Sequence, residues 1–517
     1  MKKTFMGIEL GSTRIKAVLI SEANAVVAQG GHSWENRLEN GVWTYPMEEV
    51  WAGLRGAVEQ LLKSLKESVS IEGLGISGMM HGYMPFDAYG NLLTPFRTWR
   101  NTFTGKASQE LTALFGRNMP QRWSITHLYH AVMNEEAHVP QIHHINTLAG
   151  YVHHRITGEF VVGIGEAIGM FPLDGKKYDA HCIRQFEKLV GEYRLPWKIS
   201  DVLPGIRRAG EYAGVLTEEG ARLLDPTGKL KAGTPLAPPE GDAGTGMVST
   251  NSIAPLTGNV SAGTSIFSMT VLDKPLSRAY PEIDIVATPT GMPVAMVHCN
   301  NCTSDINAWV RTYHEFCGLV GADVSEDEVF RKFYLESLKG DPDCGGVVVV
   351  GYLSGEHVTD FETGCPLMLR SPAGSFTLPN FLRAQLYSAL ASLAIGMRIL
   401  KREHVVIKQL TGHGGLFRTP KVGQQFLADA VNAPVTVMET AAEGGAYGMA
   451  VLAAYRVNRA EGETLESYLE NKVFADARRT VLAPTEEGLK GFGTYLERFE
   501  RALKVERAAI GAEIFNQ

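Results

Sequence analysis

The chain has 517 residues, and its 49 Lys and Arg against 56 Asp and Glu give a formal net charge of −7. A hydrophobic content of 44% excludes a disordered chain, and the mild acidity argues against a nucleic-acid partner. The length predicts two large domains or three small ones. We find no uninterrupted apolar run of about 18 residues and no signal peptide. Six scattered cysteines do not form a disulfide framework, so we expect a cytoplasmic protein with no membrane partner.

The first 80 residues predict an α/β arrangement. Residues 4–10 and 15–20 are typical of two strands, joined by the tight turn Gly11-Ser12-Thr13. A helix is expected to begin at Pro46, because the apolar residues that follow keep the 3.6-residue period. A further strand is expected over residues 71–77.

A strand–turn–strand passage of the same kind returns about 250 residues later, over residues 259–271, with the turn Gly263-Thr264-Ser265. Periodicity then predicts a helix over 382–400, a strand over 405–410, a helix over 420–432, a strand over 434–438 and a helix over 446–456. The Gly- and Pro-rich stretch 233–246 lies between the two α/β halves. Its turn-forming residues predict a linker that hinges two lobes.

Phosphate chemistry is indicated at the two turns. Each offers backbone N–H groups and hydroxyls, which can hold phosphate oxygens, and Lys16 follows the first turn with a positive charge. Either turn alone is also typical of an ordinary hairpin. Asp242 lies among small residues, where a substrate hydroxyl can approach it as a general base requires; an ordinary turn aspartate is the alternative.

Three other motifs do not carry the function. Gly73-x-Gly75-x-x-Gly78 matches a dinucleotide-binding pattern, but no helix is predicted directly after it, so we reject that interpretation. Cys299-x-x-Cys302 is half of a zinc site or a redox pair, and we interpret it as two reduced thiols because no second pair exists. Seven histidines lie between residues 127 and 154, and we interpret them as solvated or capping side chains.

Taken together, these passages resemble the FGGY family of carbohydrate kinases, within the actin-like ATPase superfamily. The segments similar to family motifs are residues 7–18 (first phosphate motif), 261–265 (second phosphate motif), 80–82 and 95–99 (sugar contacts), 155–159 and 165–169 (the middle of the family pattern), 241–242 (catalytic aspartate) and 411–448 (adenosine segment). Thr411-Gly412-His413-Gly414-Gly415, with the fixed offsets to Gln425, Asp429 and Glu443, is the most specific of these matches.

The resemblance implies two ribonuclease-H-like (actin-like ATPase) α/β domains with a central cleft: a sugar-binding domain over 1–246 and a nucleotide-binding domain over 247–517. It implies ATP and Mg²⁺ as cofactors and a small-molecule sugar as partner, and it leaves a homodimer open. The residues that it implies are Asp242 as base; His81, Trp99, Arg100 and Asn101 with Asp242 at the sugar; Gly11, Ser12, Thr13, Lys16, Gly263, Thr264, Gly412, Gly414, Gly415 and Glu443 at ATP; and Glu9 at the metal through water.

Several positions depart from the family pattern. Glu9 stands where most members have Asp, Asn101 replaces a common substrate-binding Asp, and Phe103 stands where an Arg is usual. The Met-His-Gly passage is similar to xylulose and ribulose kinases, so the expected reaction is ATP-dependent phosphorylation of a ketopentose. The alternatives are a kinase for a different sugar or polyol, such as a deoxy-ketose or glycerol, and an actin-like nucleotide-binding protein of weak or no activity.

Overall fold

The computed structural model describes residues 1–438 and 444–512. The chain forms two compact units. Unit 1 contains residues 1–253, 285–294 and 443–476, and unit 2 contains residues 254–284, 295–442 and 477–517. Within the described residues, no helix combines the length and the hydrophobicity that crossing a bilayer requires.

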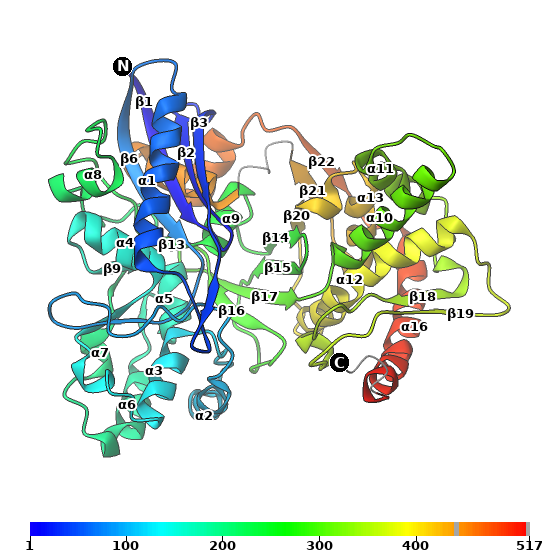
Figure 1. Ribbon diagram of the computed structural model, residues 1–517, viewed down its shortest axis with the longest axis horizontal. Helices are drawn as coiled ribbons and strands as arrows, with labels where there is room; N and C mark the ends of the chain where they lie inside the picture. Colours follow the sequence, from blue (N-terminus) through cyan, green and yellow to red (C-terminus); the bar gives the residue numbers. More distant parts are fainter. Residues whose placement is uncertain (439–443, 513–517) are drawn as a thin grey trace. The chain divides into compact units, whose positions relative to one another are not determined.

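Unit 1 is built on a five-stranded sheet in which the predicted hairpin pairs with a parallel strand (Figure 1). In spatial order its strands are β13 (Glu240–Gly241), β6 (Val69–Gly78), β1 (Lys2–Leu10), β2 (Arg14–Ser21) and β3 (Val26–Ser33). The hairpin register places Glu9 opposite Lys16. The turn at residues 11–13 therefore lies at the end of the sheet where Glu9 is found.

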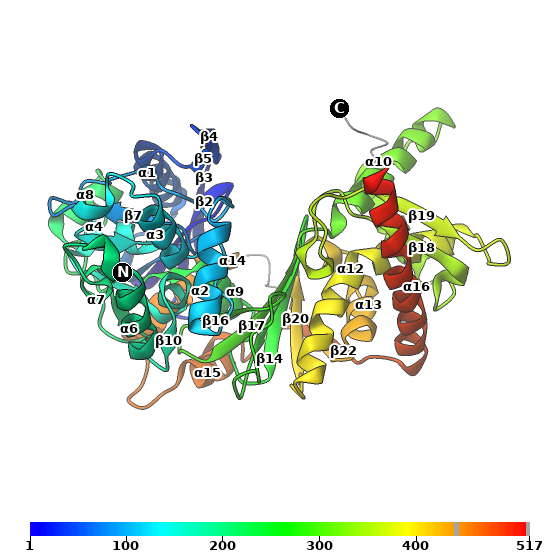
Figure 2. The same ribbon diagram turned by 90° about the horizontal axis from the view of Figure 1, so that it is seen from below.

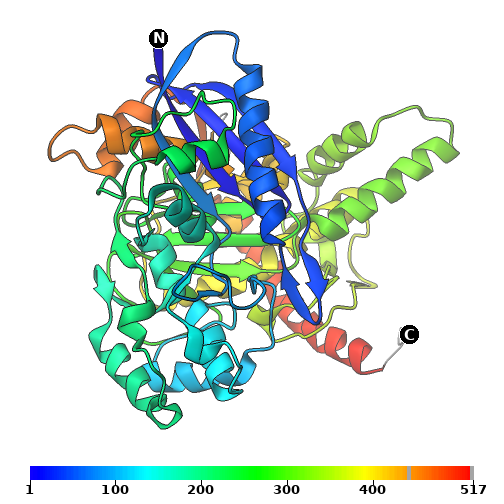
Figure 3. The ribbon, with the colours of Figure 1, turned by 60° about the vertical axis from the view of Figure 1, so that its left-hand side comes forward.

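Two helices pack on this sheet. Helix α1 (Met47–Ser64) follows Pro46, has Glu48 and Glu49 in its first turn, and buries Leu54 and Val58. Figure 3 shows α1 lying along the strands β2 and β3. Helix α14 (Gly444–Asn458) contacts β1 and β6, which it approaches so closely that a side chain at Gly7 would overlap its backbone.

Several of the remaining elements of unit 1 form a second apolar core around Leu111, Leu128 and Phe186. Its helices are α2 (Gly105–Phe115), α3 (Ser124–Met133), α4 (Leu148–Thr157), α5 (Ile164–Met170), α6 (Ala180–Leu189), α7 (Ile199–Val202), α8 (Glu218–Leu224), α9 (Asp242–Ser249) and α15 (Leu465–Tyr468). The short strands are β4 (Arg37–Glu39), β5 (Val42–Thr44), β7 (Met84–Phe86), β8 (His144–Asn146), β9 (Val161–Gly163), β10 (Leu173–Asp174), β11 (Lys177–Tyr178) and β12 (Gly205–Arg207).

Unit 2 contains most of a seven-stranded sheet. In spatial order its strands are β16 (Asp284–Ala287), β17 (Pro293–Cys299), β15 (Ile266–Val271), β14 (Thr257–Ala262), β20 (Gln409–His413), β21 (Val435–Met438) and β22 (Arg479–Leu482). Strands β18 (Val347–Val350) and β19 (Leu367–Arg370) form a separate two-stranded antiparallel sheet. The helices are α10 (Thr303–Leu319), α11 (Glu326–Ser337), α12 (Leu378–Arg402), α13 (Val422–Val431) and α16 (Glu486–Gly511).

Helices α12 and α13 pack together against the large sheet (Figure 2), and α12 buries Leu386, Leu390 and Leu393 at the helical period expected from the sequence. Strand β14 pairs in parallel with β20, which places Ser261 opposite His413. The second predicted turn therefore lies beside the segment that contains Gly412 and Gly414.

The Gly- and Pro-rich stretch 233–246 is not a free linker. Glu240 and Gly241 form β13 and pair with Ser77 and Gly78 of β6, and Asp242 begins α9. The stretch lies inside unit 1, because backbone hydrogen bonds to β6 hold it. Its turn-forming composition instead allows the chain to pass tightly from strand to helix at Asp242.

Candidate active site

Asp242 is the first residue of α9 and lies next to the loop that follows β6. Its Oδ1 accepts the N–H of Ala243 at 2.9 Å and the N–H of Met80 at 3.4 Å. Burial raises the pKa of Asp242 to about 6, although these backbone N–H groups oppose the rise. Because Met80 precedes His81, the structure brings the predicted base together with the loop predicted to contact a sugar.

Glu9, at the end of β1, is a second carboxyl group in this region. Its Oε2 accepts the N–H of Ala446 at 3.2 Å, and Gly445 leaves room for it, since a side chain there would overlap Oε1. Burial and the negative charge of Asp242 raise the pKa of Glu9 to about 7, while the N–H of Ala446 and the charge of Lys16 lower it. Glu9 and Asp242 thus interact as two like charges.

The turn Gly11-Ser12-Thr13 is held through its carbonyl oxygens. Trp34 Nε1 donates to the oxygen of Gly11 at 2.7 Å, the Tyr45 hydroxyl to that of Ser12 at 2.5 Å, and the backbone N–H of Trp34 to that of Thr13 at 3.2 Å. Ser12 and Thr13 are exposed. These hydrogen bonds therefore fix the carbonyl groups of the turn, while the side chains of Ser12 and Thr13 are exposed to solvent.

The residues predicted at the sugar have different surroundings. His81 is buried with a backbone φ of 71°, and burial holds the pKa of its imidazole well below the usual range, so it is neutral. Trp99 is 40% exposed. The Arg100 guanidinium lies 3.8 Å from the centre of the Trp43 ring. Asn101 is buried, and its amide binds protein groups.

Asn101 fixes the segment around Trp43. Its Oδ1 accepts the N–H of Trp43 at 2.8 Å, and its Nδ2 donates to the carbonyl oxygens of Trp43 at 2.8 Å and Thr98 at 3.0 Å. An aspartate here would lose both donated bonds, which gives a physical reason for the amide at this position. The direct sugar contacts of Asn101, Arg100, Trp99 and His81 stay predictions.

Two buried glutamates near Asp242 were not predicted from the sequence. Burial and the charge of Asp242 raise the pKa of Glu166, on α5, to about 8; burial and the charge of Glu166 raise the pKa of Glu240, on β13, well above its ordinary value. A side chain at Gly165 would overlap the Glu240 carboxyl group. The signal in the sequence is a single acidic residue within the otherwise apolar or small-residue segments 161–170 and 235–241.

In unit 2, residues at the N-terminal end of α10 donate hydrogen bonds to the turn that contains Gly263 and Thr264. The N–H of Cys302 donates to the carbonyl oxygen of Thr264 at 3.0 Å, and Thr303 donates to that of Gly263 from its N–H at 3.0 Å and from Oγ1 at 2.7 Å. Gly414, with φ of 100°, lies against the backbone of Ala262, directly before the turn. This contact and the positive φ both favour glycine there.

Of the other residues predicted at ATP, the structure describes Gly412 and Gly415 but not Glu443. Gly412 faces the ring of Phe417, where a side chain would overlap the ring, and Gly415 begins a short 3₁₀ turn. Glu443 lies outside the described residues. The structure thus places Gly412, Gly414 and Gly415 beside the second turn, and the nucleotide contacts themselves stay predictions.

The alternative motifs do not form a metal site. Cys299 and Cys302 are free and buried, and burial raises the pKa of both thiols, which disfavours the thiolate that binds metal. Residues 1–438 and 444–512 contain no group of three metal-binding side chains. Our interpretation of the histidines as solvated or capping is wrong for His127 and His153, which are fully buried, because α3 and α4 pack these faces inward.

Comparison with known proteins identifies the family. The model of the FGGY family of carbohydrate kinases, N-terminal domain, matches residues 4–248, and that of the C-terminal domain matches residues 258–457. The chain is 23% identical to the xylulose kinase of Haemophilus influenzae over 515 residues, which cover 96% of this chain and 98% of that protein.

Solved structures share the fold over nearly the whole chain. The xylulose kinase of Rhodospirillum rubrum has a TM-score of 0.78 at 17% identity, covering 98% of this chain and 99% of that one. The gluconate kinase of Lactobacillus acidophilus also has a TM-score of 0.78 at 17% identity, covering 98% of each chain. This protein belongs to the FGGY family of carbohydrate kinases. It has the two-domain actin-like ATPase fold and is a sugar kinase that uses ATP.

Proposed function

We propose that the protein transfers the γ-phosphoryl group of ATP to a hydroxyl of a ketopentose of the xylulose or ribulose type, with Asp242 as the general base. The observation that carries this proposal is the hydrogen bond between Asp242 and Met80 N–H, since Met80 directly precedes His81. Support for the sugar class comes from the similarity to the xylulose kinase of Haemophilus influenzae and from the Met-His-Gly passage.

Each step is assigned to a residue of this chain. Asp242 accepts the proton of the attacking hydroxyl, and a pKa of about 6 leaves it ionised at neutral pH while keeping it basic enough for that transfer. The turn Gly11-Ser12-Thr13 with Lys16 in unit 1, and Gly263-Thr264 in unit 2, bind phosphate oxygens through N–H groups and hydroxyls. The neutral His81 and the half-exposed Trp99 orient the sugar.

Residues 1–246 are assigned to sugar binding and residues 247–517 to nucleotide binding. In the second segment, Gly412, Gly414 and Gly415 are assigned to the adenosine, because they lie beside the Gly263 turn. Glu443 keeps the same assignment from the family pattern alone.

Mg²⁺ fits a position beside the buried carboxyl group of Glu9. Carboxylate oxygens are the ligands that Mg²⁺ prefers, directly or through water, and the like-charge interaction that raises the pKa of Glu9 is relieved by a cation. When bound, the ion neutralises charge on the phosphate oxygens. Glu9 is one methylene longer than the usual Asp, and we assign its contact through water.

The test is sugar-dependent ADP formation by the purified protein and by the Asp242→Asn variant. Xylulose and ribulose are compared with gluconate, glycerol and a deoxy-ketose at equal concentrations. We expect the highest kcat/KM for a ketopentose and a loss of about 10²- to 10⁴-fold in the variant. A higher kcat/KM for gluconate or glycerol would overturn the sugar class, and turnover that survives Asp242→Asn would overturn the base.

A further inference from the structure

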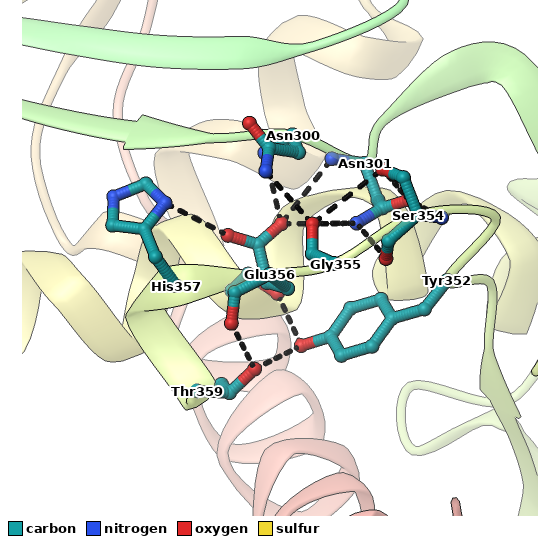
Figure 4. A network of polar contacts seen from close by, with 9 residues as sticks. Asn300, Asn301, Tyr352, Ser354, Gly355, Glu356, His357 and Thr359 are labelled. Atoms are coloured by element: carbon teal, nitrogen blue, oxygen red, sulfur yellow. Dashed lines mark hydrogen bonds and ion pairs between the residues drawn. The ribbon is translucent and has the colours of Figure 1, made fainter. Parts of the chain in front are cut away.

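Glu356 is a buried carboxyl group in unit 2, in the loop between β18 and β19. Its Oε2 accepts the backbone N–H of Asn300 at 2.9 Å and that of Asn301 at 3.2 Å (Figure 4). It also accepts Nδ2 of Asn301 at 3.2 Å. One carboxylate oxygen therefore binds two consecutive backbone N–H groups in the loop between β17 and α10.

The two loops also bind each other in the opposite direction. Oδ1 of Asn301 accepts the N–H groups of Leu353 at 2.9 Å and Ser354 at 3.1 Å. Nδ2 of Asn300 donates to the carbonyl oxygen of Gly355 at 2.8 Å (Figure 4). Residues 300–301 and residues 353–356 are thus joined by reciprocal hydrogen bonds, with the Glu356 carboxyl group as the acceptor of three of them.

Cys302 and Thr303, which follow Asn301, donate hydrogen bonds to the turn that contains Gly263 and Thr264. Cys302 N–H binds the carbonyl oxygen of Thr264, and Thr303 binds that of Gly263 through both its N–H and its hydroxyl. Residues 300–303 are consecutive, so a displacement of residues 300–301 is passed directly to the groups that hold Gly263 and Thr264. Glu356 itself has no part in the reaction as proposed above.

We propose that Glu356 is a positioning residue for ATP binding, which fixes the Gly263-Thr264-Ser265 turn through residues 300–303. Without the carboxyl group, the N–H group of Asn300 and the buried N–H group of Asn301 lose an acceptor, and the loop moves to find another. A small displacement of phosphate-binding groups is enough to weaken binding. This inference rests on the phosphate-binding role proposed for the turn, and its readout, nucleotide affinity, does not depend on which sugar is the substrate.

The test measures the Kd for ADP by titration calorimetry, without sugar, for Glu356→Ala and Glu356→Gln. We expect Glu356→Ala to raise the Kd at least tenfold, because it removes the acceptor. Glu356→Gln keeps a carbonyl oxygen for the same N–H groups, and its Kd should stay within twofold of wild type. The KM for the sugar should change less than twofold in both variants.

A matched control distinguishes positioning from general stability. Glu506, on α16 in unit 2, is also buried, accepts the N–H of Cys365 at 2.7 Å, and has its pKa raised by burial to about 7, as Glu356 does. Glu506→Ala should lower the melting temperature and leave the Kd for ADP within twofold. An equal loss of affinity in Glu506→Ala, or wild-type affinity in Glu356→Ala, would overturn the inference.

A second variant covers the case in which Glu356→Ala does not fold. Thr303→Val removes the hydroxyl donated to Gly263 and should raise the Kd for ADP about threefold; an unchanged Kd would overturn the inference. Because the readout is nucleotide affinity, a protein that binds ADP but phosphorylates no ketopentose contradicts only the proposed substrate. The comparison of Glu356→Ala with wild type remains decisive in that case.

Discussion

The buried Glu166 makes the stability of unit 1 depend on pH, and Glu166→Gln is expected to remove part of that dependence. Burial and the charge of Asp242 raise the pKa of Glu166 to about 8, above its ordinary value in the unfolded chain. Between these two pKa values, the folded state holds a proton that the unfolded state has released. Stability therefore falls as pH rises through this interval and becomes level above about pH 8.

The magnitude follows from the proton that folding must take up. Each pH unit in this interval costs about 1.4 kcal/mol, so raising the pH from 5 to 7 costs the wild-type protein about 3 kcal/mol through Glu166. Glutamine has a similar shape and takes up no proton. The stability of Glu166→Gln relative to wild type should therefore increase by about 3 kcal/mol over the same pH range.

Urea unfolding followed by tryptophan fluorescence measures this difference. Six of the seven tryptophans, at positions 34, 43, 51, 99, 123 and 197, belong to unit 1, so the signal reports mainly on that unit. Glu218→Gln is the control, because it makes the same substitution at a side chain that is 84% exposed. A pH dependence for Glu166→Gln that is no larger than that for Glu218→Gln from pH 5 to 7 would refute the protonated, buried carboxyl group.

Three further predictions concern the site. Since burial raises the pKa of Asp242 to about 6, kcat/KM for the sugar should fall about tenfold per pH unit below pH 6; a level profile down to pH 5 would contradict this base. Gly414→Ala puts a methyl group against the Ala262 backbone at a φ of 100°, and the KM for ATP should rise at least tenfold; an unchanged KM would be inconsistent with this contact. Asn101→Asp replaces the Nδ2 donor with an acceptor that faces two carbonyl oxygens, and should lower the free energy of unfolding by about 2–4 kcal/mol in urea. An unchanged free energy of unfolding would show that the segment around Trp43 does not need these bonds.

The local elements could be predicted from the sequence, because their signals are local. The hairpin of β1 and β2 and strand β15 follow from strand-like runs joined by Gly-containing turns. The helix from Met47 and the long helix α12 follow from hydrophobic periodicity. The strand expected at residues 405–410 instead covers Gln409–His413, and Val406 is exposed. The parallel pairing of β14 with β20 joins residues about 150 positions apart, and no local pattern in the sequence indicates it.

In the candidate site, too, the features that are contiguous in the sequence could be predicted, and those that depend on distant residues could not. The Gly-Ser-Thr turns and the small residues around Asp242 are visible in the sequence because each is contiguous. The raised pKa values of Glu166, Glu240 and Glu356 cannot be seen in the sequence, because each carboxyl group is buried beside residues that are distant in the chain. A lone acidic residue in an apolar segment is the available signal, and it does not reveal which group the carboxyl will face.

The two turns proposed to bind phosphate share a property that their sequences do not explain. In a trans peptide, the carbonyl of one residue and the N–H of the next point in opposite directions. Binding the carbonyl oxygens of Gly11 and Ser12 therefore directs the N–H groups of Ser12 and Thr13 away from Trp34 and Tyr45. In unit 2, Cys302 and Thr303 bind the carbonyl oxygens of Thr264 and Gly263 and have the same effect on the next N–H groups. The residues that donate differ between the two turns, but in both turns a backbone N–H group and a hydroxyl bind the carbonyl oxygens.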